Sequence, residues 1–272
     1  MPEESNQGLS QEDRLTASDR TSLPSPIIYE TVRNEGHVEL ERPLKSLSWS
    51  GFAAGIALSL SIYGTAFLHS AVGGLPGAAA IESIGYTVGF LIVILGRLQL
   101  FTENTITAVL PLLADFTRKN LLRTGRLWGI VFLTNMAGSF FSAFFVYEGL
   151  VLPDQQVTAV LEISQHLLGY SGWQVMAYGV PAGFLVAALV WLMPASREYE
   201  FWVISIITYM IALGGLTHVV AGSTEWFFLA LDGQLSWLDC WLSGILPALV
   251  GNIIGGTGLF AIISYGQVKE EL

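Results

Sequence analysis

Charged residues are scarce in this sequence and are missing from five long stretches. Asp, Glu, Lys and Arg make up 12% of the 272 residues, about half the share of an ordinary soluble domain, and mean hydropathy is +0.56. No charged residue occurs in 46–81, 127–147, 163–196, 201–224 or 240–268. A membrane-spanning helix needs about 20 predominantly apolar residues. The sequence therefore excludes a soluble globular domain and predicts an all-α membrane protein embedded in a lipid bilayer.

Other function classes lack the residues they require. The single cysteine, Cys240, excludes an intrachain disulfide, and the net charge of −10 argues against binding to nucleic acid. The four histidines are scattered along the chain, and no Ser/His/Asp set, metal-ligand cluster or phosphate-binding loop is recognisable. We therefore expect no enzyme activity, no metal and no cofactor.

Lysine and arginine are missing from alternate connections between the apolar stretches. A sixth stretch, 79–114, is interrupted by Glu82, Arg97 and Glu103, which gives six candidate spans. The connections near 70–78, 149–172 and 230–238 contain no Lys or Arg, and only Arg97 falls inside a span. Because positive residues stay on the cytoplasmic side, this alternation predicts six spans in the inner (plasma) membrane with both termini in the cytoplasm.

The chain divides into a polar tail and an apolar domain. Residues 1–45 hold nine acidic and five basic residues and few aromatics, a composition typical of disorder. Within this cytoplasmic tail, residues 28–41 are compatible with a short surface helix. We expect residues 46–268 to form the transmembrane channel domain and 269–272 the cytoplasmic C-terminus.

Spans two and five are interrupted in a similar way. The interruptions, at 96–104 and 214–225, each end in Thr-Glu, as Thr102-Glu103 and Thr224-Glu225. A threonine followed by an acid is a helix-start signal, so each element is predicted to be a helix, a loop at membrane depth and a second half-helix.

The spans that follow the interruptions match as well. Asn-x-x-Gly occurs at 135–138 in span three and at 252–255 in span six. Asn135 and Asn252 are expected to hydrogen-bond the loose backbone groups of the two loops. Three spans per half place the halves in opposite orientation, which predicts a 3+3 inverted repeat with a transport site at the interruptions.

Broken helices suit a pore for anions. Irregular backbone survives at membrane depth only against protein or a water-filled cavity. Two half-helices that start near the midplane aim the positive ends of their dipoles inward and supply N–H donors without a buried cation. Such weak binding permits release. The sequence therefore favours a conduit for small monovalent anions.

Three motifs resemble the formate/nitrite transporter family: Leu-Phe-Thr at 100–102, the glycine-rich 214–221, and Gly-Asn at 251–252 with the glycines that follow. The variants at 103–105 and 222–225 are most similar to its YfdC-like branch. The resemblance implies an aquaporin-like protomer of six helices and a homopentamer in which each protomer has its own pore. It also implies substrates such as formate, nitrite and hydrosulfide.

The same resemblance assigns pore residues. It implies that His218 is the protonatable group at the midpoint of the pore and that Thr102 is the loop threonine. It implies apolar constrictions at Leu100 on one side and at Phe90 and Ile211 on the other. The position of a pore-lining valine matches Val186.

The sequence departs from the family pattern at several positions. Thr217 stands where the formate channels carry an acid before the histidine, and Gly183 stands where they carry an asparagine. The stretch 149–172 contains no lysine to match theirs, and Arg97 is an addition. These departures put formate or nitrite in doubt as the specific substrate.

Several residues have two interpretations. His218 is either a structural histidine or a group that passes a proton to the anion, and Thr102 either caps a half-helix or lines the pore. Arg97 either forms a buried bridge with Glu103 or Glu225 or attracts anions. Leu100, Phe90 and Ile211 would be ordinary core residues without the resemblance.

Two other functions stay open beside the anion channel. One is a channel for a neutral solute such as water or an undissociated acid. The other is a non-conducting membrane sensor or scaffold whose acidic tail binds a cytoplasmic partner.

Overall fold

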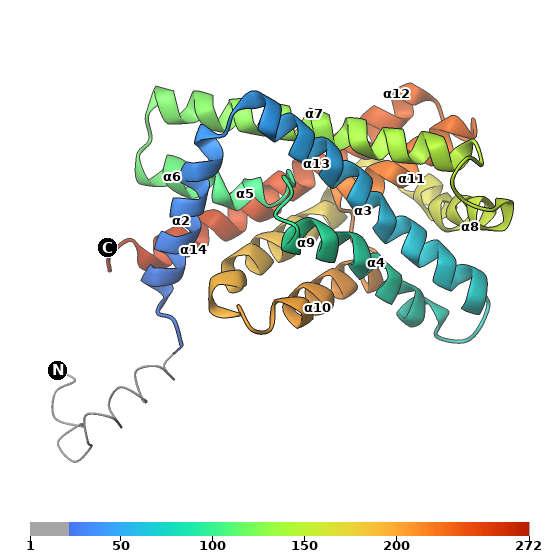
Figure 1. The fold of residues 1–272 in the computed structure, drawn as a ribbon, viewed down its shortest axis with the longest axis horizontal. Helices are drawn as coiled ribbons and strands as arrows, with labels where there is room; N and C mark the ends of the chain where they lie inside the picture. The colour runs from blue at the N-terminus through green and yellow to red at the C-terminus, as the bar shows by residue number, and fades with distance from the viewer. Residues whose placement is uncertain (1–21, 272) are drawn as a thin grey trace, which may run out of the picture.

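The computed structural model describes residues 22–271, and all of their regular structure is helical (Figure 1). Of the tail predicted over 1–45, residues 1–21 lie outside the described residues. The described chain begins with α2 (Ser25–Glu41), α3 (Leu44–Val72) and α4 (Ala78–Leu95). After a break come the short helices α5 (Asn104–Thr107) and α6 (Val109–Ala114), and then the long α7 (Arg118–Tyr147).

The second part of the chain is organised similarly. It contains α8 (Asp154–Ser164), the 3-10 turn η2 (Gln165–Gly169), α9 (Gly172–Leu192) and the turn η3 (Met193–Ala195). The helices α10 (Glu200–Leu213) and α11 (Val219–Leu231) follow. The last helix, Trp237–Val268, is continuous but alternates between α and π geometry in α12 (Trp237–Asp239), η4 (Cys240–Ile245), α13 (Leu246–Ile253), η5 (Ile254–Ala261) and α14 (Ile262–Val268).

Five helices are long and apolar enough to cross a membrane. They are α3, α4, α7, α9 together with η3, and the last helix, Trp237–Val268. The apolar segments Asn104–Ala114, Glu200–Leu213 and Val219–Leu231 are shorter. The predicted spans two and five are thus each interrupted by a non-helical segment. We name these segments the first break (96–103) and the second break (214–218).

Both breaks begin with the same backbone turn. The amide of Leu98 donates to the carbonyl of Val93 over 2.9 Å, and the amide of Leu216 donates to that of Ile211 over 3.0 Å. In each turn the preceding residue is left-handed, with φ of 53° at Arg97 and 60° at Gly215. This is the usual way to end a helix, and glycine is the residue that fits it best. Arg97 occupies a backbone conformation that a side chain disfavours.

The first half-helix begins directly after its Thr-Glu pair, whereas the second begins well before its pair. Helix α11 starts at Val219, so Thr224 and Glu225 lie inside it, and the predicted start is wrong. The physical reason is the side chain of His218, whose Nδ1 accepts the Ala221 amide hydrogen over 3.2 Å and caps the helix. In the first break, α5 starts at Asn104 without a side-chain cap.

Close backbone approach holds the long helices together. Gly55 of α3 and Gly138 of α7 face one another so closely that a Cβ on either would collide with the partner's backbone. Gly179 of α9 and Gly251 of α13 make the corresponding contact. Small residues at helix contacts are the typical packing device of membrane proteins. In Figure 1, α7 runs along one edge of the molecule, α10 lies at the opposite edge, and α3 crosses between them.

Helix α2 is packed against the membrane helices. It starts at Ser25, and its Tyr29 and Val32 are fully buried against Ile106 and Leu110 of α5 and α6. Figure 1 shows α2 crossing α14 near the end of the molecule where the chain terminates. The helix lies beside the first break, because its Glu35 and Glu39 contact Arg97 and Gln99.

Candidate pore

An asparagine clamps the first break. The Asn135 Oδ1 accepts the amide hydrogen of Phe101 over 2.9 Å, and its Nδ2 donates to the carbonyls of Gln99 and Gly51, each over 2.8 Å. Asn135 is completely buried. Since an unpaired backbone group costs about 1–3 kcal/mol when buried, this one side chain makes an irregular segment tolerable at membrane depth.

A second asparagine clamps the second break with the same pattern. The Asn252 Oδ1 accepts the amide hydrogen of Val219 over 2.8 Å, and its Nδ2 donates to the carbonyls of Thr217 and Gly179, each over 2.9 Å. The residue between the two clamped groups is Leu100 in the first break and His218 in the second. The clamps therefore align Leu100 with His218, a correspondence between the two breaks that the Thr-Glu pairs do not indicate.

The two breaks meet at Thr102 and His218. The Thr102 Oγ1 lies 2.7 Å from the His218 Nε2, and both side chains are buried. The Nδ1 of His218 accepts a hydrogen from the Ala221 amide. This assigns the proton of a neutral imidazole to Nε2, which then donates to Thr102. The hydroxyl hydrogen of Thr102 is left without an acceptor among the described residues and can be offered to a third group.

The residues predicted to constrict the pore are buried near this pair. The centroids of the Phe90 and His218 rings lie 5.0 Å apart, and the rings make an edge-to-face contact. Leu100, Ile211 and Val186 have no exposed surface and belong to the same apolar cluster. The Thr102–His218 pair is therefore a polar contact within apolar surroundings.

A cavity opens on each side of the pair. One, which we name the α8 vestibule, has a volume of about 350 Å³ and reaches His218 from the N-terminal part of α4 and from α8. The other, the α2 vestibule, has a volume of about 300 Å³ and is lined by α2, the first break and the residues that join α9 to α10. Ala79 lines the first and Leu95 the second, so the cavities lie at opposite ends of α4. Phe90 lies on the part of α4 between them.

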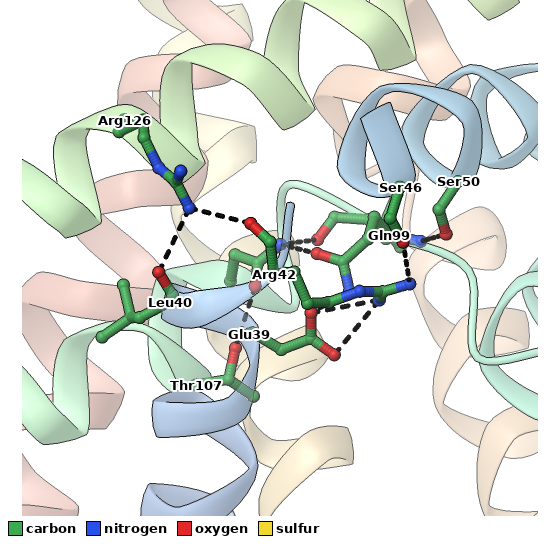
Figure 2. Close-up of polar contacts among 10 residues, drawn as sticks. Glu39, Leu40, Arg42, Ser46, Ser50, Gln99, Thr107 and Arg126 are labelled. Atoms are coloured by element: carbon green, nitrogen blue, oxygen red, sulfur yellow. Dashed lines mark hydrogen bonds and ion pairs between the residues drawn. The ribbon is translucent and has the colours of Figure 1, made fainter. Parts of the chain in front are cut away.

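Helix α2 is tied to the first break by a carboxylate. The Gln99 Nε2 donates to the Glu39 Oε2 over 2.7 Å, and Arg42 lies 3.1 Å from the same oxygen. The backbone amide of Gln99 donates to the Ser50 hydroxyl over 3.0 Å. Figure 2 shows Glu39 between Arg42 and Gln99, with Arg126 reaching the carbonyls at the end of α2. The contact between Glu39 and Gln99 thus holds the first break against α2 at the residue that precedes Leu100.

Arg97 does not form the expected buried bridge. Its side chain is 78% exposed, and its Nη1 lies 3.2 Å from the Glu35 Oε1 on α2. Neither Glu103 nor Glu225 pairs with it among the described residues. The left-handed backbone at Arg97 points the side chain out of the break towards α2, and this orientation explains why the predicted bridge is wrong.

The two glutamates of the Thr-Glu pairs lie in different vestibules. Glu103 lines the α2 vestibule, and its Oε1 is buried without a hydrogen-bond partner among the described residues. Glu225 lines the α8 vestibule. The hydroxyl of Thr224 lies 2.9 Å from that of Ser59 on α3, so this threonine connects α11 to α3.

The structure adds residues that sequence reasoning passed over. Gln99, Glu39 and Ser50 fix the first break, and Trp128 donates its indole hydrogen to the Asn104 carbonyl over 3.0 Å. A polar residue inside an apolar stretch, as Gln99 is, was the available signal. No group of three or more potential metal ligands occurs between residues 22 and 271.

The sequence matches the family described as "Formate/nitrite transporter" over residues 26–266. The chain belongs to the formate/nitrite transporter family. It is 38% identical over 256 residues to the inner membrane protein YfdC of Escherichia coli strain K12, a match that covers 93% of this chain and 83% of that protein. The formate channel FocA of Haemophilus influenzae is 22% identical over 244 residues, with coverage of 79% and 84%.

Two solved structures have a similar fold. A pentameric formate channel with formate bound superposes with a TM-score of 0.71 at 19% identity and covers 84% of this chain and 98% of its own. An "FNT family ion channel" gives a TM-score of 0.71 at 17% identity, with coverage of 89% and 98%. The predicted family, its YfdC-like branch and the class of a transport protein rather than an enzyme are thereby confirmed.

Proposed function

We propose that the protein is a membrane channel or transporter that carries small monovalent anions of weak acids, together with a proton, between the two vestibules. The observation that carries this proposal is the buried Thr102–His218 contact between two cavities at opposite ends of α4. A substrate that passes from one cavity to the other must cross the apolar layer of Phe90, Leu100 and Ile211 beside that contact. A hydroxyl that can donate a hydrogen bond at this depth suits a small oxygen-bearing solute.

The membrane topology proposed here has six spans. Helices α4, α5 and α6 together make span two, and α10 with α11 makes span five, so that each broken helix counts once. The matching clamps of Asn135 and Asn252 support a 3+3 inverted repeat in an aquaporin-like arrangement. The distribution of Lys and Arg supports a position of the α2 vestibule on the cytoplasmic side of an inner membrane. The pentameric relative and the apolar outer faces support a homopentamer.

The Thr102 hydroxyl is the proposed first contact for the substrate. Because Nε2 of His218 donates to Thr102, the threonine is free to donate its own hydrogen to an anion oxygen. An isolated ion in an apolar layer is very costly, and a weak acid can avoid that cost by accepting a proton. Protonation at His218 would in turn require the Ala221 amide to leave Nδ1. Proton transfer to the substrate is therefore coupled to the cap of α11.

Uptake into proteoliposomes tests the proposal. We expect the parent protein to take up formate, acetate, nitrite or hydrosulfide at rates that rise as pH falls, and to pass chloride poorly. His218→Gln keeps hydrogen bonding but removes the titration, so weak-acid uptake should be lost or become independent of pH. His37→Gln, at an exposed position on α2, is the matched control. A His218→Gln variant with the parent rate and pH profile would show that His218 is structural.

One observation favours the transport of a neutral solute as a second candidate function. The α8 vestibule contains no Lys or Arg among the described residues, so it has no fixed positive charge to attract an anion. Osmotic shrinkage of the same proteoliposomes in water and small alcohols tests this function. Fast water or alcohol flux without weak-acid uptake would favour it over the anion channel.

A further inference from the structure

The α8 vestibule gathers titratable side chains from five separate elements. They come from α3, α4, α8, η2 and α11. The acidic and imidazole groups are His69, Glu82, Glu162, His166 and Glu225. Tyr86 of α4 and His218 itself complete the titratable lining, and no Lys or Arg lines the cavity within residues 22–271.

One imidazole is shared by two of the three carboxylates. The His69 Nδ1 lies 2.9 Å from the Glu82 Oε1, and its Nε2 lies 3.5 Å from the Glu162 Oε2. A protonated His69 can therefore offset part of the charge of this pair. Even when both His69 and His166 are charged, the three ionised carboxylates leave the vestibule with an excess of negative charge.

Glu225 is the one carboxylate of the vestibule that lies on the same helix as His218. His218, Gly222 and Glu225 are four and three residues apart, and all three line the cavity, so they share one face of α11. Seven residues of helix place Glu225 roughly 10 Å along the axis from His218. Glu225 makes no hydrogen bond or ion pair with any described residue, in contrast to Glu82.

The space between Glu225 and His218 is open. A Cβ built on Gly222 would meet no atom within 4 Å. An incoming solute therefore passes over Gly222 with the Glu225 carboxylate beside it before it reaches His218. Charges in a confined, poorly solvated site interact much more strongly than in bulk water.

We propose that Glu225 is a selectivity residue that keeps free anions out of the α8 vestibule and admits small weak acids in their uncharged form. This inference rests on the proposed transport of weak acids and specifies the form in which they pass this entrance. An ionised Glu225 repels an anion, whereas its oxygens accept the O–H of an undissociated acid. No bond is made or broken at Glu225, because an acid that enters by this side already carries a proton from the water outside, and one that leaves by this side has received its proton at His218.

Cysteine labelling measures the charge selectivity without relying on transport. Gly222→Cys places a thiol in the open space, while the native Cys240 is buried and serves as the unreactive background. The rates with a cationic and an anionic methanethiosulfonate reagent are each divided by the rate of the same reagent with a free thiol. At pH 7.5 we expect a normalised cation preference of about tenfold or more, and a loss of most of it in Gly222→Cys/Glu225→Gln.

Matched variants separate Glu225 from the other acids. Glu148→Gln removes an exposed acid outside the vestibule and should leave the preference unchanged, whereas Glu82→Gln should reduce it less than Glu225→Gln does. If Gly222→Cys fails to fold, Ala79→Cys at the mouth of the vestibule provides a second reporter, and Glu225→Met provides a second neutral substitution. A preference that is unchanged in both Glu225 variants overturns the proposal.

Formate uptake then tests which form is admitted. Above the pKa of the acid, the uncharged fraction falls about tenfold per pH unit, and we expect uptake from the α8 side by the parent to fall with it. Glu225→Gln should flatten this slope, and a slope equal to that of the parent would contradict the inference. If the parent moves no weak acid at any pH but the labelling shift is found, the proposed function fails while the exclusion of anions by Glu225 stands.

Discussion

Leu100 and His218 hold the same place in two breaks that are built alike. Each lies between a carbonyl and an amide that one buried asparagine holds, Asn135 in the first break and Asn252 in the second. The same scaffold thus presents an apolar side chain from one break and a polar side chain from the other. The difference lies only in the side chain, so the chemistry of this position can vary while the backbone stays fixed.

The two asparagine clamps should be among the most sensitive positions of the molecule. Asn135→Ala and Asn252→Ala each remove three hydrogen bonds and leave one carbonyl and one amide at the break unpaired, because the third partner is a carbonyl inside α3 or α9. At about 1 kcal/mol or more per group, each variant should lose at least about 2 kcal/mol of unfolding free energy or fail to assemble. Thermal unfolding in detergent measures this. The side chain of Asn120 bonds only exposed atoms of Asp115, so Asn120→Ala should change stability by less than about 1 kcal/mol. Equal losses in all three variants would contradict the clamp.

Substitutions at Arg97 separate its ion pair from its backbone. Arg97→Ala and Arg97→Gly both remove the exposed pair with Glu35, which contributes about 0–1 kcal/mol. The left-handed conformation at φ 53° costs a residue with a side chain about 1–2 kcal/mol. Glycine adopts this conformation without that cost, whereas alanine does not. Arg97→Gly should therefore unfold at a higher temperature than Arg97→Ala. Equal unfolding temperatures would mean that the turn is not strained at Arg97.

Two glycine-to-alanine changes should have opposite signs. A Cβ at Gly183 would collide with the backbone of Asn252, so Gly183→Ala should displace the second clamp and cost about 2 kcal/mol or more. A Cβ at Gly125 in α7 meets nothing within 4 Å, so Gly125→Ala should stabilise the helix by about 0.5–1 kcal/mol. Unfolding midpoints of the two purified variants give the comparison, and a stabilising Gly183→Ala would refute the close contact.

Tyr29 should make the docking of α2 sensitive to alkaline pH. Burial raises the pKa of its hydroxyl above the usual value of 10.0, with an opposing contribution from Arg33, and the hydroxyl has no hydrogen-bond partner among the described residues. A raised pKa means that stability is complete below about pH 10 and falls as pH rises above it, because the unfolded chain ionises more readily. Tyr29→Phe should lose this dependence and gain up to about 1 kcal/mol at neutral pH. Unfolding midpoints at about pH 8 and pH 10.5 measure both effects, and a variant that keeps the parent's alkaline loss would exclude Tyr29 as its source.

The apolar stretches and the two interruptions were readable because both are local properties of the sequence. A run without charge predicts a membrane helix, and Gly214-Gly215 marks a place where a helix ends. The start of α11 was predicted at Thr224 because threonine is a common cap. The actual cap is His218, a residue whose capping depends on the position of its ring rather than on a general preference.

Contacts between distant segments could not be predicted from local rules. Arg97 pairs with Glu35 because α2 folds back beside the first break, and nothing in the sequence near Arg97 indicates that return. The vestibule of His69, Glu82, Glu162 and Glu225 likewise depends on how α3, α4, α8 and α11 pack. In the sequence Glu82 resembles an ordinary group at the end of a span, and Glu225 only marks the second interruption.

The position of the clamps also sets an order for events during synthesis. Asn135 lies on α7 and Asn252 on the last helix, so each break leaves the ribosome before the side chain that will hold it. Until then its free amides and carbonyls cannot rest in hydrocarbon. Each broken helix must therefore wait at a wet or protein-lined surface of the insertion machinery until the following span arrives. A nascent chain that stalls between a break and its asparagine would be the form most exposed to quality-control proteases.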